Sequence, residues 1–599
     1  MDRKQTPLRP YFEKMPDIGK PLTDSEKRRK AANVAAVMEE MAKVAAAIEK
    51  VKNAGSSVDD IHKKGKMTVF ERIEYLVDPG TWCPLHTLYD PAFNDEGTTG
   101  VIDGLAKISG RWAVVIGFDN KVIAGAWIAG QIENILRVTD MAKILNVPLV
   151  WVLECSGVKL MEQEKVYPNR RGGGTTFFRH SELNIKGTPI LNAIFGTNPA
   201  GGGYHGISPT ILIAHKDANI AVGGAGIVGG MNPKGYFDLE AAEALINATR
   251  NLRAKPPGRV EIHFDETAFF REVYDEETGV LDAIKDWMKA IPAYEPRFFR
   301  VAAPAEPKFP AEDLNYIVEM NQKRPYDSIE VLARLVDNSE FLEYRPDYGP
   351  EVYTGLAKID GFLVGVIGNR NGVFPGYPSY LPEGTAGVGG KHYRQGLIKQ
   401  NEFVTLCGRD NIPIIWIQDT TGIDVGDNAE KAELLGLGQA LIFSIEKTTI
   451  PHMCIVLRKG TAAAHYIMGG PPANENNVFT LGTPATEIYV MHGETAAAAT
   501  YSRRLVKDKD AGKDLDPTIQ KMNEMVQMYY DKSRPVFCAQ MGLVDEVVAF
   551  TDLRKYCVAF VGAAYQNPKS ITPVHQMILP RSIYGHIEHV NEYLKNQKG

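Results

Sequence analysis

The stretch "NVPLVWVLECSGV" at residues 146–158 is written a second time in this chain, as "NIPIIWIQDTTGI" at residues 411–423. Both copies begin with Asn, keep a Pro and a Trp at the same places, and have a Gly second from the end. Each has an acid near its end, Glu154 in the first copy and Asp419 in the second. An apolar run rich in β-branched and aromatic residues is typical of a buried strand. We therefore expect the same strand and turn twice.

Four further matches occur in the same order along the chain. They pair residues 76–82 with 335–341, 104–110 with 355–361, 188–204 with 450–466, and 218–226 with 486–494. The separation between the partners stays between 251 and 268 residues. Solenoid repeats have periods of only ~20–50 residues. The pattern instead predicts a duplicated domain with small insertions in the second copy.

Within each copy, predicted strands alternate with predicted helices. In the first copy, apolar strands at 112–119 and 148–154 flank residues 129–146, whose apolar side chains recur at helical spacing. The second copy repeats this order at 362–370, 394–411 and 413–419. This alternation predicts an α/β fold with right-handed strand–helix–strand crossovers.

The repeat and the proline content suggest the domain boundaries. A capping box at 23–26 opens a helical pattern, so residues 1–60 are predicted to be an N-terminal helical extension. The predicted domains are 61–295 and 313–560, joined by a linker at 296–312 and followed by a tail at 561–599. The linker carries four prolines, which disfavour helix and favour an extended segment.

The composition excludes several classes of protein. The chain has 599 residues, 44% of them hydrophobic, which is enough for two or more cores. Its 67 basic and 73 acidic residues give a net charge of −6, which does not indicate a nucleic-acid or membrane surface. No run approaches the ~20 apolar residues of a membrane helix, and the first residues lack a signal peptide. The six cysteines form no CxxC pair, so we expect no metal site and a cytoplasmic location.

Small residues follow the predicted strands at matched places in both copies. These turns are 155–158 and 199–203 in the first copy, and 420–423 and 461–464 in the second. A strand that ends in such a turn before a helix directs backbone N–H groups and the positive helix end toward one point. Two N–H donors that converge on one oxygen form an oxyanion hole. The turns therefore predict one anion-stabilising site in each copy.

Plainer explanations exist for each of these residues. A Gly after a strand is often only a tight turn, and the run 201–203 also suits close helix–strand packing. His205 and His465 are interpreted as packing or hydrogen-bonding residues rather than general bases. Glu154 and Asp419 are interpreted as groups that orient the turns. The chain has no P-loop, GxSxG elbow or HExxH motif.

These motifs resemble those of the biotin-dependent acyl-CoA carboxyltransferases. The similar stretches are "GKMTVFERIEYLVDPGTW" (65–82), "GLAKISG" (104–110), "GLAKIDG" (355–361), "PATEIYVMHGETAA" (484–497) and "GLVDEVV" (542–548). The resemblance implies an α/β chain of two tandem crotonase-like (ClpP/crotonase) domains that arose by internal duplication.

The chain also departs from the family pattern. Many members have Ser-Gly-Gly-Ala-Arg in the first turn, where this chain has "SGVKL" (156–160), and Tyr-Gly-Gly-Ala in the fourth, where it has "TAAA" (461–464). It lacks the zinc ribbon of the bacterial acetyl-CoA carboxylase subunit. With its length and N-terminal helix, it looks most like the members that act on glutaconyl-CoA in the sodium-pumping decarboxylases of glutamate-fermenting anaerobes.

The resemblance implies transfer of the carboxyl group of glutaconyl-CoA to N1 of biotin, which yields crotonyl-CoA after protonation. Negative charge develops on the thioester oxygen and on the ureido oxygen of biotin, so each reactant needs an oxyanion hole. Carried over to this chain, the acyl-CoA hole uses the backbone N–H groups of Gly157, Val158, Gly201 and Gly202. The biotin hole uses those of Gly422, Ile423, Ala462 and Ala463.

The CoA ester also needs cations for its phosphates. The basic residues Lys159, Lys165, Arg170 and Arg171 follow the first turn. Arginine suits bidentate contacts to phosphate or carboxylate, and one of these side chains could hold the distal carboxylate of the substrate. A solvated charged loop explains the same residues at least as well.

The resemblance implies several partners. The chain lacks the "MKM" tripeptide of biotinyl domains, so biotin is expected on a separate carrier subunit. In the family, a site joins the first domain of one protomer to the second domain of its neighbour, which implies a homodimer or larger assembly. A sodium pump further implies a membrane-embedded decarboxylase subunit, with this chain docked on its cytoplasmic side. No nucleic acid is expected.

Three other functions compete with this hypothesis. The substrate could be propionyl-, methylmalonyl- or methylcrotonyl-CoA. A biotin-independent crotonase-type hydratase or hydrolase would need carboxylate bases near the first hole and no second hole. A non-catalytic scaffold subunit would transfer nothing to free biotin.

Overall fold

The computed structural model describes residues 14–168, 170–206, 209–230, 234–291, 300–382 and 384–566. The chain forms two compact units. The first unit comprises residues 48–293, and the second comprises residues 1–47 and 294–599. Residues 296–299 of the predicted linker and 567–599 of the predicted tail lie outside the described residues.

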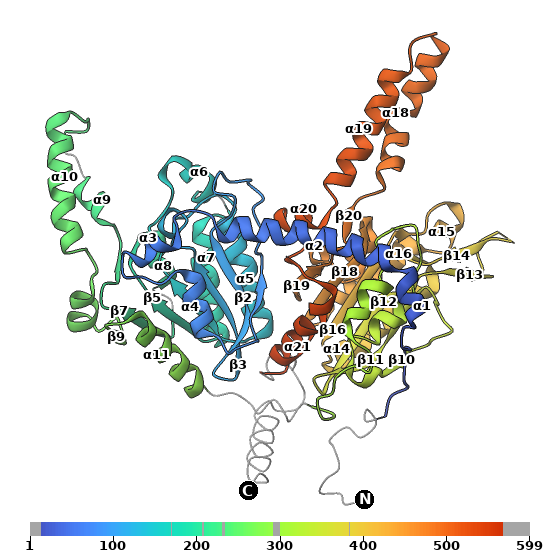
Figure 1. The fold of residues 1–599 in the computed structure, drawn as a ribbon, viewed down its shortest axis with the longest axis horizontal. Helices are drawn as coiled ribbons and strands as arrows, with labels where there is room; N and C mark the ends of the chain where they lie inside the picture. Colours follow the sequence, from blue (N-terminus) through green and yellow to red (C-terminus); the bar gives the residue numbers. More distant parts are fainter. Residues whose placement is uncertain are drawn as a thin grey trace, which may run out of the picture. The chain divides into compact units, whose positions relative to one another are not determined.

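A seven-stranded mixed sheet forms the centre of the first unit (Figure 1). Its strands are, in spatial order, β1 (Cys83–Leu85), β2 (Val101–Ile108), β3 (Arg111–Phe118), β4 (Leu149–Leu153), β5 (Ile190–Ile194), β7 (Ile211–His215) and β9 (Glu272–Tyr274). The first three strands pair antiparallel, and every later neighbour is parallel.

The second unit repeats this sheet strand for strand. The order is β10 (Phe341–Glu343), β11 (Val352–Ile359), β12 (Phe362–Asn369), β16 (Ile414–Thr420), β18 (His452–Thr461), β19 (Asn477–Gly482) and β21 (Glu546–Val547), with β20 (Glu487–Tyr489) paired to the end of β18. The antiparallel and parallel pairings fall at the same places as in the first unit. The predicted duplicated α/β fold is therefore confirmed.

Helices connect and cover the strands. In the first unit they are α3 (Val58–His62), α4 (Val69–Leu76), α5 (Gln131–Leu145), α6 (Gln163–Val166), α7 (Gly173–Lys186), α8 (Gly201–Gly206), α9 (Ala225–Gly229), α10 (Leu239–Ala254) and α11 (Glu277–Ala290). The rest of the described chain contains α1 (Asp24–Arg29), α2 (Ala31–Lys52), α12 (Leu314–Ile317), α13 (Ser328–Leu332), α14 (Arg394–Asp410), α15 (Asp427–Lys431), α16 (Leu434–Lys447), α17 (Ala462–Ile467), α18 (Gly493–Asp510), α19 (Asp516–Asp531), α20 (Pro535–Gln540) and α21 (Leu553–Ala564). The predicted helices 129–146 and 394–411 are α5 and α14, and the predicted capping box opens α1.

The short strands show that the repeat holds residue by residue. In the first unit, β6 (Thr197–Pro199) pairs with β8 (Asn219–Ala221), beginning at Thr197 and Asn219. In the second unit, the matched residues Lys459 and Glu487 begin the pairing of β18 with β20. The isolated bridge between Trp127 and Val158 returns as the pairing of β15 (Lys391–His392) with β17 (Gly422–Ile423).

Left-handed backbone conformations recur at the same spacings. Ala200 and Ala462 have φ values of +49° and +51°, and Gly157 and Gly422 have values of +102° and +128°. Because few residues adopt positive φ without a structural reason, these matches indicate that the turns themselves were duplicated.

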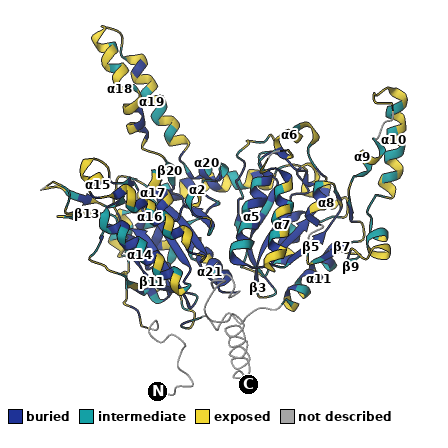
Figure 2. Ribbon diagram, turned by 180° about the vertical axis from the view of Figure 1, so that it is seen from behind, coloured by how far each residue is buried: buried dark blue, intermediate teal, exposed yellow. Residues whose placement is uncertain are grey.

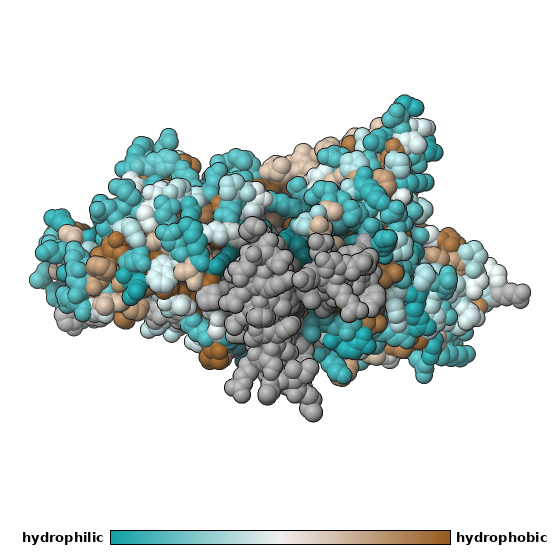
Figure 3. All heavy atoms as spheres, turned by 90° about the horizontal axis from the view of Figure 1, so that it is seen from below, coloured by the Kyte–Doolittle hydropathy of each residue, from teal (hydrophilic) through white to brown (hydrophobic). Residues whose placement is uncertain are grey.

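Burial follows the sheets. In the first unit, apolar residues of α4 and α11 pack with β3, β4, β5 and β7 in one core. The strands of both sheets are largely buried, whereas α10 and the α18–α19 hairpin are exposed along most of their length (Figure 2). Among the helices of the described residues, none combines the length and apolar character needed to span a bilayer. On the face drawn in Figure 3, hydrophobic residues are scattered among hydrophilic ones.

Candidate functional site

The first turn of the first copy follows β4 and is held by two backbone hydrogen bonds to one residue. The N–H of Trp127 donates to the carbonyl of Gly157 at 2.8 Å, and the N–H of Lys159 donates to the carbonyl of Trp127 at 2.9 Å. These bonds lie on either side of Val158. Within the described part of the chain, the N–H of Val158 has no hydrogen-bond partner. This N–H is therefore available to a ligand oxygen.

The matching turn of the second copy has the same construction. The N–H of Thr421 donates to the carbonyl of Gly390 at 2.8 Å, and that of Asp424 donates to the carbonyl of His392 at 3.0 Å. A Cβ built on Gly422 would meet nothing within 4 Å, so the space beside this residue is open. Its positive φ and open surroundings fit the approach of a ligand carbonyl.

The second turn of each copy leads into a short helix. Because the first N–H groups of a helix have no acceptor within it, those of Gly201 and Gly202 at the start of α8 remain available to other acceptors. A Cβ on Gly202 would lie 2.6 Å from the carbonyl oxygen of Cys155, and one on Gly201 would lie 2.9 Å from the Trp127 ring. The glycine run therefore does serve close packing, and this packing brings the first and second turns of the first copy together.

The residues with positive φ show how the residues of α8 correspond to those of α17. Ala200, which precedes α8, donates its N–H to the carbonyl of Ala221 at 2.8 Å. Its match by position and φ is Ala462, the first residue of α17. Gly201 and Gly202 therefore correspond to Ala463 and Ala464, and Ala464 is a candidate that the sequence analysis missed. The match of residues 188–204 with 450–466 already implies this alignment, but the predicted set did not follow it.

The acid at the end of the first matched strand is paired and buried. Glu154 accepts hydrogen bonds from Arg72 Nη1 at 2.8 Å and from Asn120 Nδ2 at 3.3 Å, and it is also bonded to Lys66. Burial raises the pKa of Glu154, but the charges of Arg72 and Lys66 outweigh it and hold the pKa below its ordinary value. Glu154 therefore stays ionised at neutral pH.

The two histidines near the turns lie in packed interiors. His205 is fully buried, stacks on Trp151 at 4.7 Å between ring centroids, and lies 5.1 Å from Trp127. Burial holds its pKa well below the ordinary value. His465 Nδ1 lies 2.9 Å from Gln418 Oε1, and burial lowers its pKa to about 4. Both rings are neutral at pH 7, as expected of packing residues.

The basic residues after the first turn differ in their pairing. Lys159 Nζ lies 2.9 Å from Glu96 and 2.6 Å from Glu162, while Lys165 lies 3.3 Å from Glu162. Arg171 donates to Glu133 at 2.8 and 3.1 Å. Arg170 is exposed, and no carboxylate of the described residues pairs with it. Arg170 is thus the cation of this set whose charge is least compensated.

Three comparisons place these features among known proteins. The carboxyl transferase domain matches residues 60–578. The glutaconyl-CoA decarboxylase subunit alpha of Acidaminococcus fermentans is 58% identical over 574 residues, which cover 96% of this chain and 97% of that protein. The biotin-dependent 3-methylcrotonyl-coenzyme A carboxylase beta1 subunit of Mycobacterium tuberculosis is 26% identical over 82% of this chain and 87% of that protein.

A solved structure supports the fold. The beta subunit of geranyl-CoA carboxylase from P. aeruginosa superposes with a TM-score of 0.74 at 20% identity, covering 94% of this chain and 98% of that one. The matched domain spans all the strands of the two duplicated sheets and all four candidate turns. The chain therefore belongs to the carboxyl transferase family.

Proposed function

We propose that this protein moves the carboxyl group of glutaconyl-CoA to N1 of biotin carried on a separate subunit, and so yields crotonyl-CoA after protonation. The observation that carries the proposal is the 58% identity, over 96% of the chain, to a protein named glutaconyl-CoA decarboxylase subunit alpha. Identity this high over nearly the full length of both proteins favours a shared substrate over the propionyl-, methylmalonyl- and methylcrotonyl-CoA alternatives.

The first copy is proposed to bind the thioester. The N–H groups of Gly157, Val158, Gly201 and Gly202 would donate to the thioester oxygen as negative charge develops on it when the carboxyl group leaves. Such donors act without reorganisation in a site that excludes water, and removing one typically costs ~10²–10³ in rate. Arg170 would hold the anionic parts of the ester, and Lys159 and Arg171 are further candidates for this role.

The second copy is proposed to bind biotin, whose N1 accepts the carboxyl group. The open space at Gly422 and its φ of +128° fit the approach of a planar carbonyl to the backbone. The N–H groups of Gly422, Ile423, Ala462 and Ala463, together with that of Ala464, would donate to the ureido oxygen. Two different carbonyls need polarisation, and a duplicated domain supplies a matched set of turns for each.

The assembly is part of the proposal. We propose a homodimer or larger oligomer that works with a biotin-carrier subunit and docks, through a membrane-embedded decarboxylase subunit, on the cytoplasmic side of the membrane. This arrangement would couple carboxyl transfer to a sodium pump.

The test is an assay of the purified full chain with free biotin. We expect crotonyl-CoA to form from glutaconyl-CoA at a rate that depends on biotin, and kcat/KM to be highest for glutaconyl-CoA among glutaconyl-, propionyl-, methylmalonyl- and methylcrotonyl-CoA. A preference for another ester would overturn the substrate assignment. Turnover that does not respond to biotin would favour a crotonase-type hydrolase or hydratase, and no turnover would favour a scaffold role.

A further inference from the structure

A buried acid stands directly before the first turn in both copies. Glu154 and Asp419 occupy matched positions, with only 5% and 2% of their surfaces exposed. Asp419 Oδ2 lies 3.0 Å from Arg458 Nε, and Glu154 Oε2 lies 2.8 Å from Arg72 Nη1. Both arginines are buried as completely as the acids.

The two arginines come from unrelated places in the repeat. Arg72 belongs to α4, whereas Arg458 belongs to β18. The residue of the first copy that matches Arg458 is Gly196, where a Cβ would lie only 2.3 Å from Glu154 Oε1. The first copy thus has no room for an arginine at the place the second copy uses. Both copies have an acid at this position, but the arginine that pairs with it comes from a different element in each. This indicates that the turn depends on the acid and not on a particular arginine.

Each acid also reaches the strand end that carries the second turn of its copy. Asp419 Oδ1 accepts the N–H of Lys459 at 3.3 Å, three residues before Ala462. In the first copy the approach is by packing, since a Cβ built on Gly196, four residues before Ala200, would lie 2.3 Å from Glu154 Oε1. Each acid therefore precedes one turn of a candidate oxyanion hole and contacts the strand end that leads into the other turn.

We propose that Glu154 and Asp419 are positioning residues, one for each hole. Each fixes the spacing of its two turns, so that their N–H groups converge on a single carbonyl oxygen. The acids do not touch the reactants, because their oxygens already face cations and amide groups. This inference rests on the proposed function, in which the first hole takes the CoA ester and the second takes biotin.

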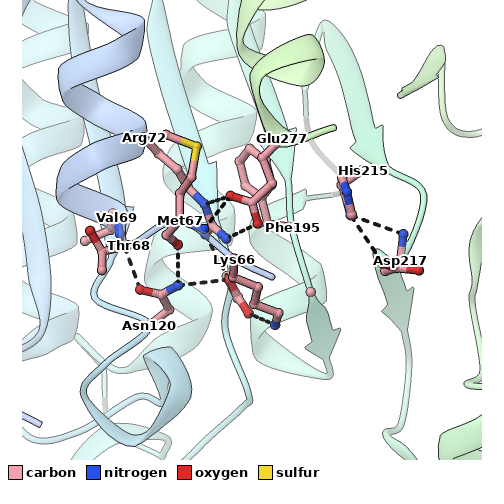
Figure 4. Close-up of polar contacts among 12 residues, drawn as sticks. Lys66, Met67, Thr68, Val69, Arg72, Asn120, Phe195, His215, Asp217 and Glu277 are labelled. Atoms are coloured by element: carbon pink, nitrogen blue, oxygen red, sulfur yellow. Dashed lines mark hydrogen bonds and ion pairs between the residues drawn. The ribbon is translucent and has the colours of Figure 1, made fainter. Parts of the chain in front are cut away.

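The structure supplies a matched control. Glu277, the first residue of α11, accepts two hydrogen bonds from the same Arg72, at 2.7 and 2.8 Å (Figure 4). It belongs to none of the four candidate turns. Both Glu154→Gln and Glu277→Gln leave Arg72 with one carboxylate fewer, so both should lower the unfolding temperature. Only Glu154→Gln should also disturb a hole.

The experiment measures kcat and KM for glutaconyl-CoA and for free biotin in the full chain. We expect Glu154→Gln to lower kcat/KM for glutaconyl-CoA by about 10–100-fold, the cost of misplacing a reactant by about 1 Å, and to leave KM for biotin unchanged. Asp419→Asn should lower kcat/KM for free biotin by a similar factor and leave KM for glutaconyl-CoA unchanged. Glu277→Gln should keep both kcat/KM values within about threefold of wild type.

Several results would overturn the inference. Equal losses for both substrates, or equal losses in Glu154→Gln and Glu277→Gln, would assign the acids a role in stability alone. If Glu154→Gln does not fold, Glu154→Asp decides the question: it keeps the charge but shortens the side chain by one methylene, and it should impair glutaconyl-CoA turnover selectively. A wild-type chain without biotin-dependent turnover would instead defeat the proposed function itself.

Discussion

At the scale of the residue, the turns depend on backbone conformations that few side chains tolerate. Gly422 has a φ of +128° and open space beside it, while Ala462 has a φ of +51° at the start of α17. A β-branched residue is strained at positive φ and would also fill the space that a ligand carbonyl needs. These two positions are therefore the sharpest probes of the second hole.

We predict that Gly422→Val or Ala462→Val abolishes carboxyl transfer to biotin, with activity falling by about 10²-fold or more, the cost of a lost oxyanion-hole donor. Binding of the CoA ester should persist, because its donors belong to the first copy. Steady-state kinetics with free biotin, combined with calorimetric titration of crotonyl-CoA, measure both quantities. Equal loss of both would argue against separate sites.

Glu351 makes a pH-dependent contribution to stability. The residue is fully buried, its Oε1 accepts the N–H of Tyr393 at 3.1 Å, and burial raises its pKa to about 7. The native state therefore binds a proton that the unfolded state, with a pKa of about 4.3, releases earlier. Between these two pKa values, stability should fall as pH rises.

We expect Glu351→Gln to flatten this dependence, because the amide stays neutral. Its unfolding temperature should exceed that of wild type at pH 8 and approach it at pH 4.5. Scanning calorimetry of both proteins over this range provides the measurement. If the variant instead unfolds at a lower temperature than wild type at pH 8, the ionised Glu351 carboxylate stabilises the folded state, and the prediction is contradicted.

Residue-scale interactions were only partly predictable from the sequence. The strands and the matched turns follow from local patterns, and the left-handed residues lie where the repeat places them. The partners of Lys159 and Arg171 do not follow in this way. Glu96 lies 63 residues from Lys159, and Glu133 lies 38 residues from Arg171. Only the folded chain brings these groups together, so nothing in the sequence singled out Arg170, which no carboxylate of the described residues pairs with, from the other three basic residues.

At the scale of the element, the first hole depends on the contact between the turn after β4 and helix α8. Gly202 lies so close to Cys155 that an added methyl would sit 2.6 Å from its carbonyl oxygen and 2.9 Å from its Sγ atom. Backbone atoms cannot move aside without moving the turn. From the sequence, this glycine run could serve either tight packing or an oxyanion hole. In the structure the glycines pack tightly, and they also form the start of α8, where the backbone N–H groups have no acceptor within the helix.

We predict that Gly202→Ala separates the two turns and lowers kcat/KM for glutaconyl-CoA by about 10–100-fold, because a small misplacement of an oriented reactant is costly. Gly174→Ala is the control, since a Cβ there meets nothing within 4 Å on the exposed part of α7. That change should leave activity intact and stabilise the helix by about 0.5–1 kcal/mol. Equal activity of the two variants would contradict the account.

At the scale of the whole molecule, the duplication is the feature that the sequence predicted best. Two sheets with the same strand order and matched turns confirm it. The residue-by-residue alignment of the two copies was less certain, because insertions in the second copy change the sequence separation between matched residues. The step from Phe118 to Trp127 spans 9 residues, whereas the matched step from Asn369 to His392 spans 23. Ala464 was left out of the predicted set for another reason: the match of residues 188–204 with 450–466 places Ala464 opposite Gly202, but the predicted pair was taken one residue earlier.

The family resemblance implies a site shared between two protomers, so the assembly is a prediction about the whole molecule. We expect the purified chain to sediment as a dimer or a larger closed oligomer at micromolar concentration, and its specific activity to fall on dilution as protomers separate. Sedimentation velocity at several concentrations tests this directly. A monomer with full activity would refute a shared site.

The central claim is that each copy polarises a different carbonyl with main-chain amides. The most direct measurement is an experimental structure of the full protein with both crotonyl-CoA and biotin bound. The account predicts the thioester oxygen about 3 Å from amide nitrogens of the turns 155–158 and 201–202, and the ureido oxygen at a similar distance from those of 422–423 and 462–464. Both carbonyls in one copy, or side chains as the only donors to either oxygen, would contradict it.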